Sequence, residues 1–278
     1  MEDTMLTTSN VWSGAAVRHV LQVLLWCALL TGGAYSQEKR IQSEKLAYGV
    51  DRANVPEAIA KVKSGDFAAI HVDLIARAGA VEAIPDLKRQ FVSVEDPLLK
   101  AKIASALVKM GEKDDTYWEY LVKLATRAVE SEAPDFTSPE FETWVKGRNL
   151  SPAETEEQLS LLPGAVGLLG MTSDPRAVPL LRRALLSPNH LTETAAAMGL
   201  AELHDKESIP LIIEACKKAP PQTAEVIAES LVYFDDNSAQ SAVDQYIPKD
   251  RAKIYRDARA HGKTSPLSTP LYDKLPNQ

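Results

Sequence analysis

Cysteine and aromatic residues are scarce in this 278-residue chain, and both shortages limit the folds it can adopt. Cys27 and Cys216 are its two cysteines, so a CxxC-type zinc or redox site cannot form. Aromatic residues make up 6% of the chain while hydrophobic residues make up 45%, so the apolar content is mostly aliphatic. A core of alanine, leucine, valine and isoleucine with few rings favours closely packed helices over a β-sandwich.

The sequence also lacks a basic cluster and a catalytic signature. The formal net charge is −7, and no run of Lys or Arg could form the basic face that a nucleic-acid partner would need. GxSxG, P-loop and GxGxxG motifs do not occur. The histidines beyond the N-terminal segment stand at no metal-ligand spacing to one another: His71, His190, His204 and His261. We therefore expect no catalytic residues, no metal, no cofactor and no nucleic-acid partner, and we predict that the protein is not an enzyme.

An apolar run near the N-terminus is too short to cross a bilayer. It covers about a dozen residues around 20–30, whereas a spanning helix needs roughly 20. Arg18 and His19 precede the run and small residues follow it, an arrangement typical of a secretory signal peptide. We predict a signal peptide over 1–36, with an uncleaved membrane anchor as the alternative.

Cleavage of this segment is expected near Ser36-Gln37, with Ala34 and Ser36 as the small residues before the cut. A linker over 37–53 would follow. No later apolar stretch is long enough to span a membrane, so no membrane span is expected after cleavage. The predicted location is outside the cytoplasm, periplasmic or secreted, in a bacterium.

A period of 31 residues runs through the second half of the chain. Asp174, Asp205 and Asp236 are spaced by 31, and each is placed to cap the N-terminus of a helix. Apolar and small residues keep the same register in four sets: Ala177, Ser208 and Ala239; Leu181, Ile212 and Val243; Leu169, Leu200 and Leu231; Ala165, Ala196 and Ile227. Each unit is predicted to contain two helices, which must stack on the next pair because one pair cannot bury its apolar face.

The repeat predicts an all-α fold, an α-solenoid (superhelix) of about six antiparallel helix pairs over 54–260. The pairs are expected at 54–78, 79–110, 114–130 with 152–171, 174–203, 205–233 and 236–260. Cys216 falls at an apolar helix position and is predicted to pack in the core. The tail, 261–278, carries prolines among polar residues and is predicted to be extended or disordered.

These units resemble the short HEAT-like repeats of phycobiliprotein bilin lyases. The residues that carry the resemblance are Ala83-Ile84-Pro85-Asp86-Leu87, Ala177-Val178-Pro179-Leu180-Leu181 and Ser208-Ile209-Pro210-Leu211-Ile212 in first helices, and Gly167-Leu168-Leu169-Gly170 in a second helix. The resemblance covers roughly 54–247, although the arginine often found early in the second helix is replaced here by Thr192 and Glu193. It implies HEAT-like repeats and, by analogy, a lyase-type or other accessory enzyme. The repeat, the signal segment and the missing catalytic site together favour instead a non-catalytic protein-interaction scaffold in the cell envelope or outside the cytoplasm. A structural spacer within a larger envelope assembly is the third possibility.

An insertion over 131–150 interrupts the third pair. Ser138-Pro139 can begin a short helix there and Gly147 can end it, while Ser151 and Glu154 are spaced as a capping box for the next helix. The segment is also acidic and rich in aromatic residues. Insertions in solenoids often emerge on a binding face, so this interruption is the predicted location of function.

Six rings in or beside the insertion form the candidate partner-binding patch: Tyr117, Trp118, Tyr120, Phe136, Phe141 and Trp144. Aromatic side chains are common anchors at protein interfaces, and the expected partner is an unidentified protein. Two alternatives stand beside this hypothesis. The rings could instead cover the broken repeat, or they could line a pocket for a small ligand. The sequence leaves the oligomeric state open.

Overall fold

The computed structural model describes residues 50–136, 138–260 and 271–272, and most of these residues are helical. Their strands are β1 (Val50–Asp51) and β2 (Leu271–Tyr272), which pair in parallel over two residues. The predicted all-α fold class is confirmed. The predicted signal peptide, most of the linker and most of the tail lie outside the described residues.

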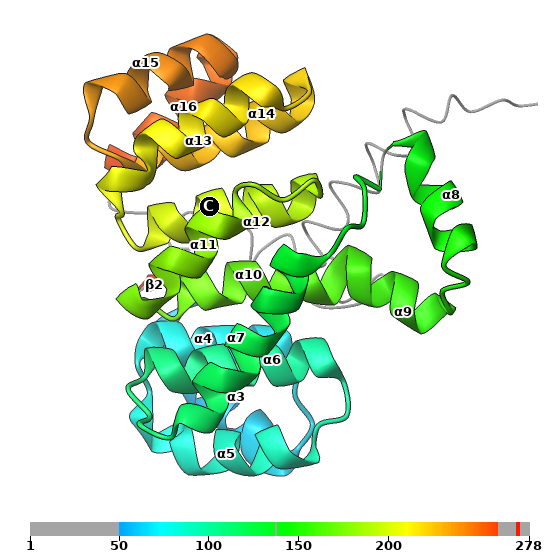
Figure 1. The fold of residues 1–278 in the computed structure, drawn as a ribbon. Helices are drawn as coiled ribbons and strands as arrows, with labels where there is room; N and C mark the ends of the chain where they lie inside the picture. The colour runs from blue at the N-terminus through cyan, green and yellow to red at the C-terminus, as the bar shows by residue number, and fades with distance from the viewer. Residues whose placement is uncertain (1–49, 137, 261–270, 273–278) are drawn as a thin grey trace, which may run out of the picture.

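Six successive helix pairs follow the predicted order and stack along one direction (Figure 1). The first two pairs are α3 (Val55–Ser64) with α4 (Ala69–Ala78), and α5 (Ile84–Ser93) with α6 (Pro97–Lys109). Short 3-10 turns precede them at η1 (Arg52–Asn54) and η2 (Val81–Ala83). Left-handed glycines end α3 and α4, at Gly65 and Gly79, where a residue with a Cβ would be strained.

The third pair is interrupted, as predicted. Its first helix is α7 (Asp115–Glu130), and its second consists of α9 (Pro152–Glu156), a π-helical turn η3 (Glu157–Leu161) and α10 (Leu162–Met171). Pro163, whose nitrogen cannot donate the usual helical hydrogen bond, lies two residues after the π turn. Between the two halves lies α8 (Pro139–Gly147), which begins and ends where the sequence predicts.

The regular second half contains the remaining three pairs. In the fourth pair, η4 (Pro175–Ala177) and α11 (Val178–Ala184) pack with α12 (His190–Glu202). In the fifth, η5 (Lys206–Ser208) and α13 (Ile209–Lys218) precede α14 (Pro221–Glu229) and η6 (Ser230–Tyr233). The sixth consists of α15 (Asn237–Tyr246) and α16 (Lys249–Ala260). The second helices contact one another in sequence, from α4 through α6, α10 and α12 to α14. This continuous row produces the solenoid.

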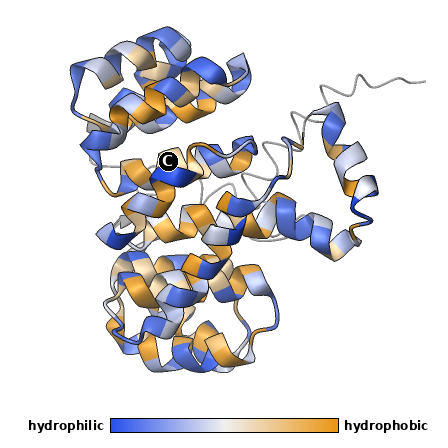
Figure 2. Ribbon diagram, in the orientation of Figure 1, coloured by the Kyte–Doolittle hydropathy of each residue, from blue (hydrophilic) through white to orange (hydrophobic). Residues whose placement is uncertain are grey.

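The residues that share the 31-residue register occupy equivalent core positions. Leu169, Leu200 and Leu231 are fully buried, and so are the members of the other three sets. All of them except the polar Ser208 belong to one hydrophobic cluster that runs from Val55 to Ala252. Figure 2 shows hydrophobic residues concentrated where neighbouring helices face one another. The sequence period therefore identifies the core correctly.

Two of the three predicted aspartate caps are present. Asp174 accepts a hydrogen bond from the backbone N–H of Arg176, and Asp236 accepts from Ser238 and Ala239. Asp205 makes no such bond, so its predicted capping role is wrong. Its carboxylate instead accepts two hydrogen bonds from the guanidinium of Arg182, at 2.8 and 2.9 Å. In this bidentate pair between neighbouring repeats both partners are charged, whereas the backbone N–H donors of a cap are neutral, which explains the exchange.

Candidate functional site

The structure places the six predicted patch residues in two separate groups. Tyr117, Trp118 and Tyr120 lie in the first turns of α7, whereas Phe136, Phe141 and Trp144 follow its C-terminal end. The rise of an α-helix, about 1.5 Å per residue, puts the two groups roughly 20 Å apart. They do not form one continuous surface.

The first group packs α7 against its neighbours. The ring of Tyr117 meets that of Phe91 edge-on, with centroids 5.0 Å apart, and the ring of Tyr120 meets Phe91 at 5.5 Å. Tyr117 is buried, and Tyr120 is half-buried. Burial raises the pKa of both phenols. These contacts favour the alternative in which the rings cover the irregular half of the solenoid.

Trp118 is covered by an arginine from the next repeat. The guanidinium of Arg176 lies 4.3 Å from the centre of the Trp118 ring. The same guanidinium binds Asp174 at 2.7 Å and Asp115 at 3.4 Å. Arg176 therefore joins α7 to the start of the fourth pair, across the interrupted repeat.

We predict that Trp118 and Arg176 are energetically coupled. Replacing either with alanine removes the stacked cation, which is worth about 0.5–1 kcal/mol at a partly exposed site. A double-mutant cycle by urea unfolding, with Trp118→Ala, Arg176→Ala and the double variant, should give a coupling energy of about that size. Strictly additive losses would show that the two side chains do not interact in solution.

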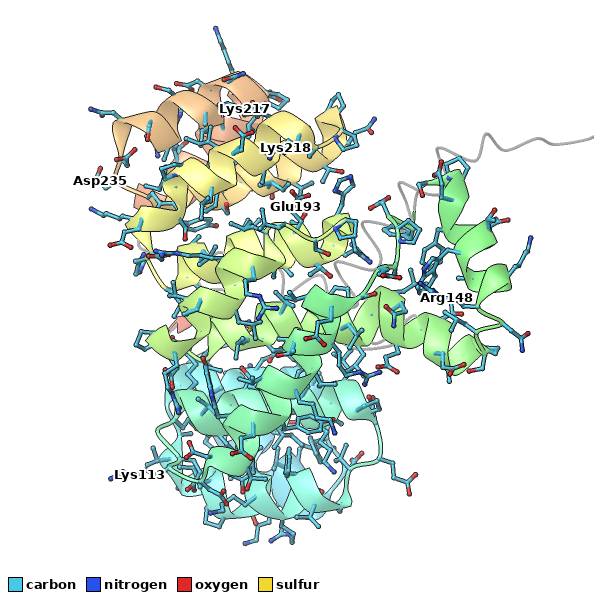
Figure 3. All side chains as sticks on the ribbon, viewed as in Figure 1. Lys113, Arg148, Glu193, Lys217, Lys218 and Asp235 are labelled. Carbon is cyan, nitrogen blue, oxygen red and sulfur yellow. The ribbon has the colours of Figure 1, made fainter. Side chains whose placement is uncertain are left out.

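The second group belongs to the insertion. Phe141 and Trp144 stack with their centroids 6.0 Å apart, and the guanidinium of Arg148 lies 5.0 Å from the Trp144 ring. Arg148 also binds Glu132 at 2.6 Å, which closes the insertion on itself. Figure 3 shows Arg148 on this arm, which lies beside the main stack of helices.

The insertion approaches the regular half of the solenoid at the start of α12. His190 Nδ1 lies 2.9 Å from the carboxylate of Glu193, which is buried (Figure 3). The hydrogen bond to Glu193 raises the pKa of His190, and the charge of Asp135 in the insertion adds to the effect. His71 differs, because burial lowers its pKa and its Nδ1 accepts a hydrogen bond from the backbone N–H of Ala68 at 2.9 Å.

The two histidines should therefore titrate on opposite sides of the ordinary value of about 6.5. The stabilising contribution of His190 should be complete below that pH and disappear as the pH rises through its raised folded-state pKa. For His71, stability should instead fall as the pH drops through its lowered folded-state pKa. Proton NMR titration of the imidazole Cε1–H signals would measure both values. Equal pKa values for the two rings would contradict the described hydrogen bonds.

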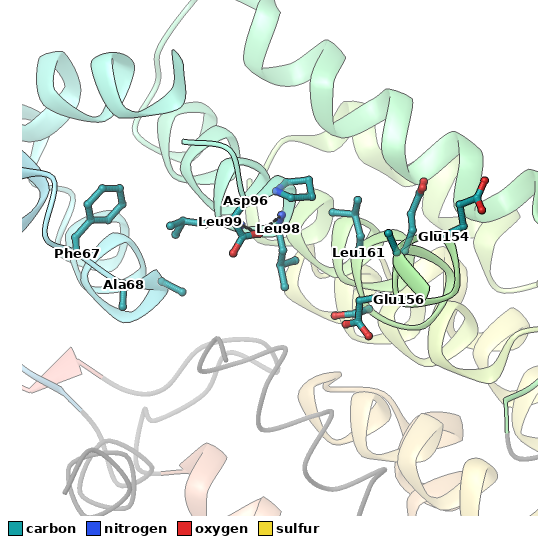
Figure 4. A pocket seen from close by; sticks show the side chains of 13 residues that line it. Phe67, Ala68, Asp96, Leu98, Leu99, Glu154, Glu156 and Leu161 are labelled. Atoms are coloured by element: carbon teal, nitrogen blue, oxygen red, sulfur yellow. Dashed lines mark hydrogen bonds between the residues drawn. The ribbon is translucent and has the colours of Figure 1, made fainter. Parts of the chain in front are cut away.

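A hollow of about 790 Å³ opens between the first two repeats and the interrupted third. Its walls come from the segment before α4, the start of α6, and the α9–η3 turn. The lining residues are Phe67, Ala68, Ala69, Asp96, Pro97, Leu98, Leu99, Ala153, Glu154, Glu156, Glu157, Ser160 and Leu161. Figure 4 shows the labelled side chains in a row, with Phe67 and Ala68 at one end, Leu98, Leu99 and Asp96 in the middle, and Leu161, Glu154 and Glu156 at the other end.

All charged side chains that line the hollow are acidic. Asp96 caps α6 by accepting from the backbone N–H groups of Leu98 and Leu99, at 2.9 and 3.2 Å. Glu154 completes the predicted capping box with Ser151, and hydrogen bonds from Ser151 lower its pKa. These two carboxylates are therefore held in place by local helix caps.

The remaining two acidic groups differ from each other. Glu157 forms an ion pair with Arg127. Glu156 is exposed, and no ion pair or hydrogen bond from the described residues reaches its carboxylate. Glu156 therefore presents a free negative charge at one end of the hollow.

The sequence does not predict this hollow, because its walls come from three distant segments, 67–69, 96–99 and 153–161. The capping box at Ser151 and the cap at Asp96 are visible in the sequence, but they indicate only where helices begin. No periodic signal links these helix starts. The close approach of α4, α6 and the α9–η3 turn depends on how the pairs stack.

The described residues contain neither a reactive thiol nor a group of metal-binding side chains. Cys216 is buried, as predicted, and burial raises the pKa of its thiol to about 12, so the thiolate is scarce at neutral pH. Within 50–260, apart from residue 137, no three His, Cys, Asp or Glu side chains are grouped closely enough to hold a metal ion. No described helix combines the length and apolar character that crossing a membrane requires.

The comparison with known families agrees with the repeat architecture. Residues 163–260 match the family model for HEAT repeats. The matched span runs from α10 to α16, the part of the chain in which the 31-residue period is regular. No curated protein matches the chain. The family match supports HEAT-like repeats without indicating an activity.

Proposed function

We propose that this HEAT-like repeat protein is a non-catalytic scaffold for protein–protein interaction that acts outside the cytoplasm, in the cell envelope or beyond it. Stacked helix pairs offer long surfaces for extended contacts, and HEAT repeats commonly mediate protein interaction. The observation that carries the proposal is the hollow beside the interrupted repeat. It has an apolar end and an acidic end, and it is the type of concave surface on which a partner segment can dock.

The proposed location rests on the sequence of the N-terminal segment, with its short apolar run and small-residue exit. Mass spectrometry of the protein purified from its native host would test it. The expected mature N-terminus is Gln37, recovered from the envelope or the medium. A chain that retains 1–36 and fractionates with the cytoplasm would refute export.

Photo-crosslinking in intact cells tests the scaffold itself. Leu98→p-benzoylphenylalanine places the reactive ketone in the middle of the hollow, whereas Val92→p-benzoylphenylalanine places it on α5, at a side chain that is 79% exposed and does not line the hollow. We expect a discrete light-dependent adduct with another polypeptide from the Leu98 variant and none from the Val92 variant. Without an adduct at Leu98, or with the same adducts at both positions, the hollow is not a docking site.

A further inference from the structure

We infer that the hollow binds an extended peptide segment in which an apolar side chain is followed by Lys or Arg. The inference rests on the proposed function and specifies the chemistry of the partner. Three properties of the hollow lead to it: its elongated shape, an apolar end that lies opposite an end with glutamates, and the sign of its charge.

The shape favours an extended occupant. Side chains from three segments lie in a row across the hollow rather than around a closed cavity (Figure 4). Ala153 and Glu156 are exposed, Leu98 and Leu99 are half-buried, and Leu161 is buried. An occupant therefore lies along the row with one side against the protein and the other side in solvent. An extended peptide, whose side chains alternate between two faces, meets this geometry.

The chemical character of the lining also changes from one end of the hollow to the other. Phe67 and Ala68 form an apolar end, and Leu98 and Leu99 continue the apolar surface to the middle. Asp96 also lies in the middle, where its carboxylate accepts hydrogen bonds from the backbone N–H groups of Leu98 and Leu99. Burying a leucine-sized side chain against such a surface is favourable by about 1.5–3 kcal/mol. The occupant should therefore place its apolar side chain between Phe67 and the Leu98–Leu99 pair.

The acidic end of the hollow favours a basic side chain in the bound peptide. Glu154 and Glu156 lie there beside Leu161, and no basic residue lines the hollow. Because no described cation neutralises Glu156, a Lys or Arg of the partner is the complementary group. An acidic segment would meet like charges along the same wall, so it should be rejected.

Fluorescence anisotropy with two synthetic peptides tests the inference on the full mature chain. The basic probe is fluorescein-labelled Ser-Leu-Gly-Lys-Leu-Arg-Gly, and the acidic probe is Ser-Leu-Gly-Glu-Leu-Asp-Gly with the same label. We expect saturable binding of the basic probe and at least tenfold weaker binding of the acidic one. Affinity for the basic probe should fall as salt is raised, because exposed charges are screened.

Two substitutions in the hollow have matched controls elsewhere on the surface. Glu156→Lys reverses the unpaired charge, and Glu82→Lys makes the same change beyond the C-terminal end of α4. Ala153→Trp fills the hollow from an exposed position, and Ala60→Trp adds the same ring to the exposed side of α3. We expect Glu156→Lys to weaken binding of the basic probe by about 3–10-fold and Ala153→Trp by more than tenfold. The two controls should stay within about twofold of the original protein.

Several results would overturn the inference. Equal binding of both probes, or a loss with Glu82→Lys as large as that with Glu156→Lys, would mean that net charge alone attracts the peptide. Unchanged binding by Ala153→Trp would place the peptide elsewhere. Preferential crosslinking of Leu98→p-benzoylphenylalanine to its own chain or to a second copy would identify a different occupant. A cellular adduct at Leu98 without binding of the basic probe would overturn this chemistry while leaving the scaffold proposal intact.

Discussion

Replacing Gly170 with alanine should lower the free energy of unfolding by about 1–3 kcal/mol, because it forces two helices apart. A Cβ at this position would lie 2.3 Å from the Cα of Gly199 on the adjacent helix. The contact is with backbone, so no flexible side chain can move aside. The glycines of α10 and α12 therefore allow the close approach that joins the interrupted repeat to the regular ones.

Gly167 provides a matched control on the same helix. A Cβ there would meet only the Cβ of Ala195, at an ordinary contact distance of 3.9 Å. Gly167→Ala should therefore be neutral or stabilising by up to about 1 kcal/mol, since alanine is the better helix former. Urea unfolding and thermal melting would compare the two variants, with each kcal/mol shifting Tm by about 2–4 °C. Similar losses from both substitutions would exclude a specific close contact at Gly170.

Removing the Asp73 carboxylate should produce the second large effect. Lys102 Nζ lies 3.3 Å from Asp73 Oδ2, and their side chains are only 3% and 8% exposed. Breaking a buried pair leaves an uncompensated charge and costs about 3–5 kcal/mol. Arg77 would also lose the favourable influence of Asp73, because burial already lowers its pKa and the Asp73 charge opposes that change. We expect Asp73→Ala to lower the free energy of unfolding by about 3–5 kcal/mol at neutral pH.

The reason for the loss can be tested by removing both charges. In Asp73→Leu with Lys102→Met, apolar side chains of similar length replace the pair, which is often neutral or stabilising for buried ion pairs. We expect this double variant to recover at least half of the stability lost in Asp73→Ala, as measured by urea unfolding. If Asp73→Ala costs less than about 1 kcal/mol, the lysine escapes to water and the pair is not effectively buried.

Local sequence rules account for much of the architecture. The short helix α8 begins after Ser138, as expected from a proline at the first turn, and ends at Gly147. The left-handed residue beyond its end is Asn149, with φ 50°, and not the glycine. The capping box at Ser151 and Glu154 is present because both partners lie within one turn of the same helix. Asp205 shows the limit of such rules. Its environment includes Arg182, 23 residues earlier, and no local pattern predicts that competitor.

The aromatic patch shows a second limit. Clustering of six rings in the sequence suggested one surface, but α7 separates Trp118 from Trp144. Trp118 then meets Arg176 from the next repeat, while Trp144 stacks within the insertion on Phe141. Residues that are close in the sequence lie far apart when a long helix separates them, because each residue of an α-helix advances along its axis by about 1.5 Å.

By itself, the sequence determined the helix pairs, their order and the identity of the core in the regular half. Helical periodicity and the 31-residue spacing are properties of neighbouring residues, and burial of Leu169, Leu200 and Leu231 follows from them. Only the tertiary structure decided where the hollow opens. Its walls come from the starts of α4, α6 and α9, and only stacking of the first three pairs brings them together. The proposed role of Glu156 in binding a basic side chain depends on the meeting of these three segments, because an isolated surface glutamate selects no partner.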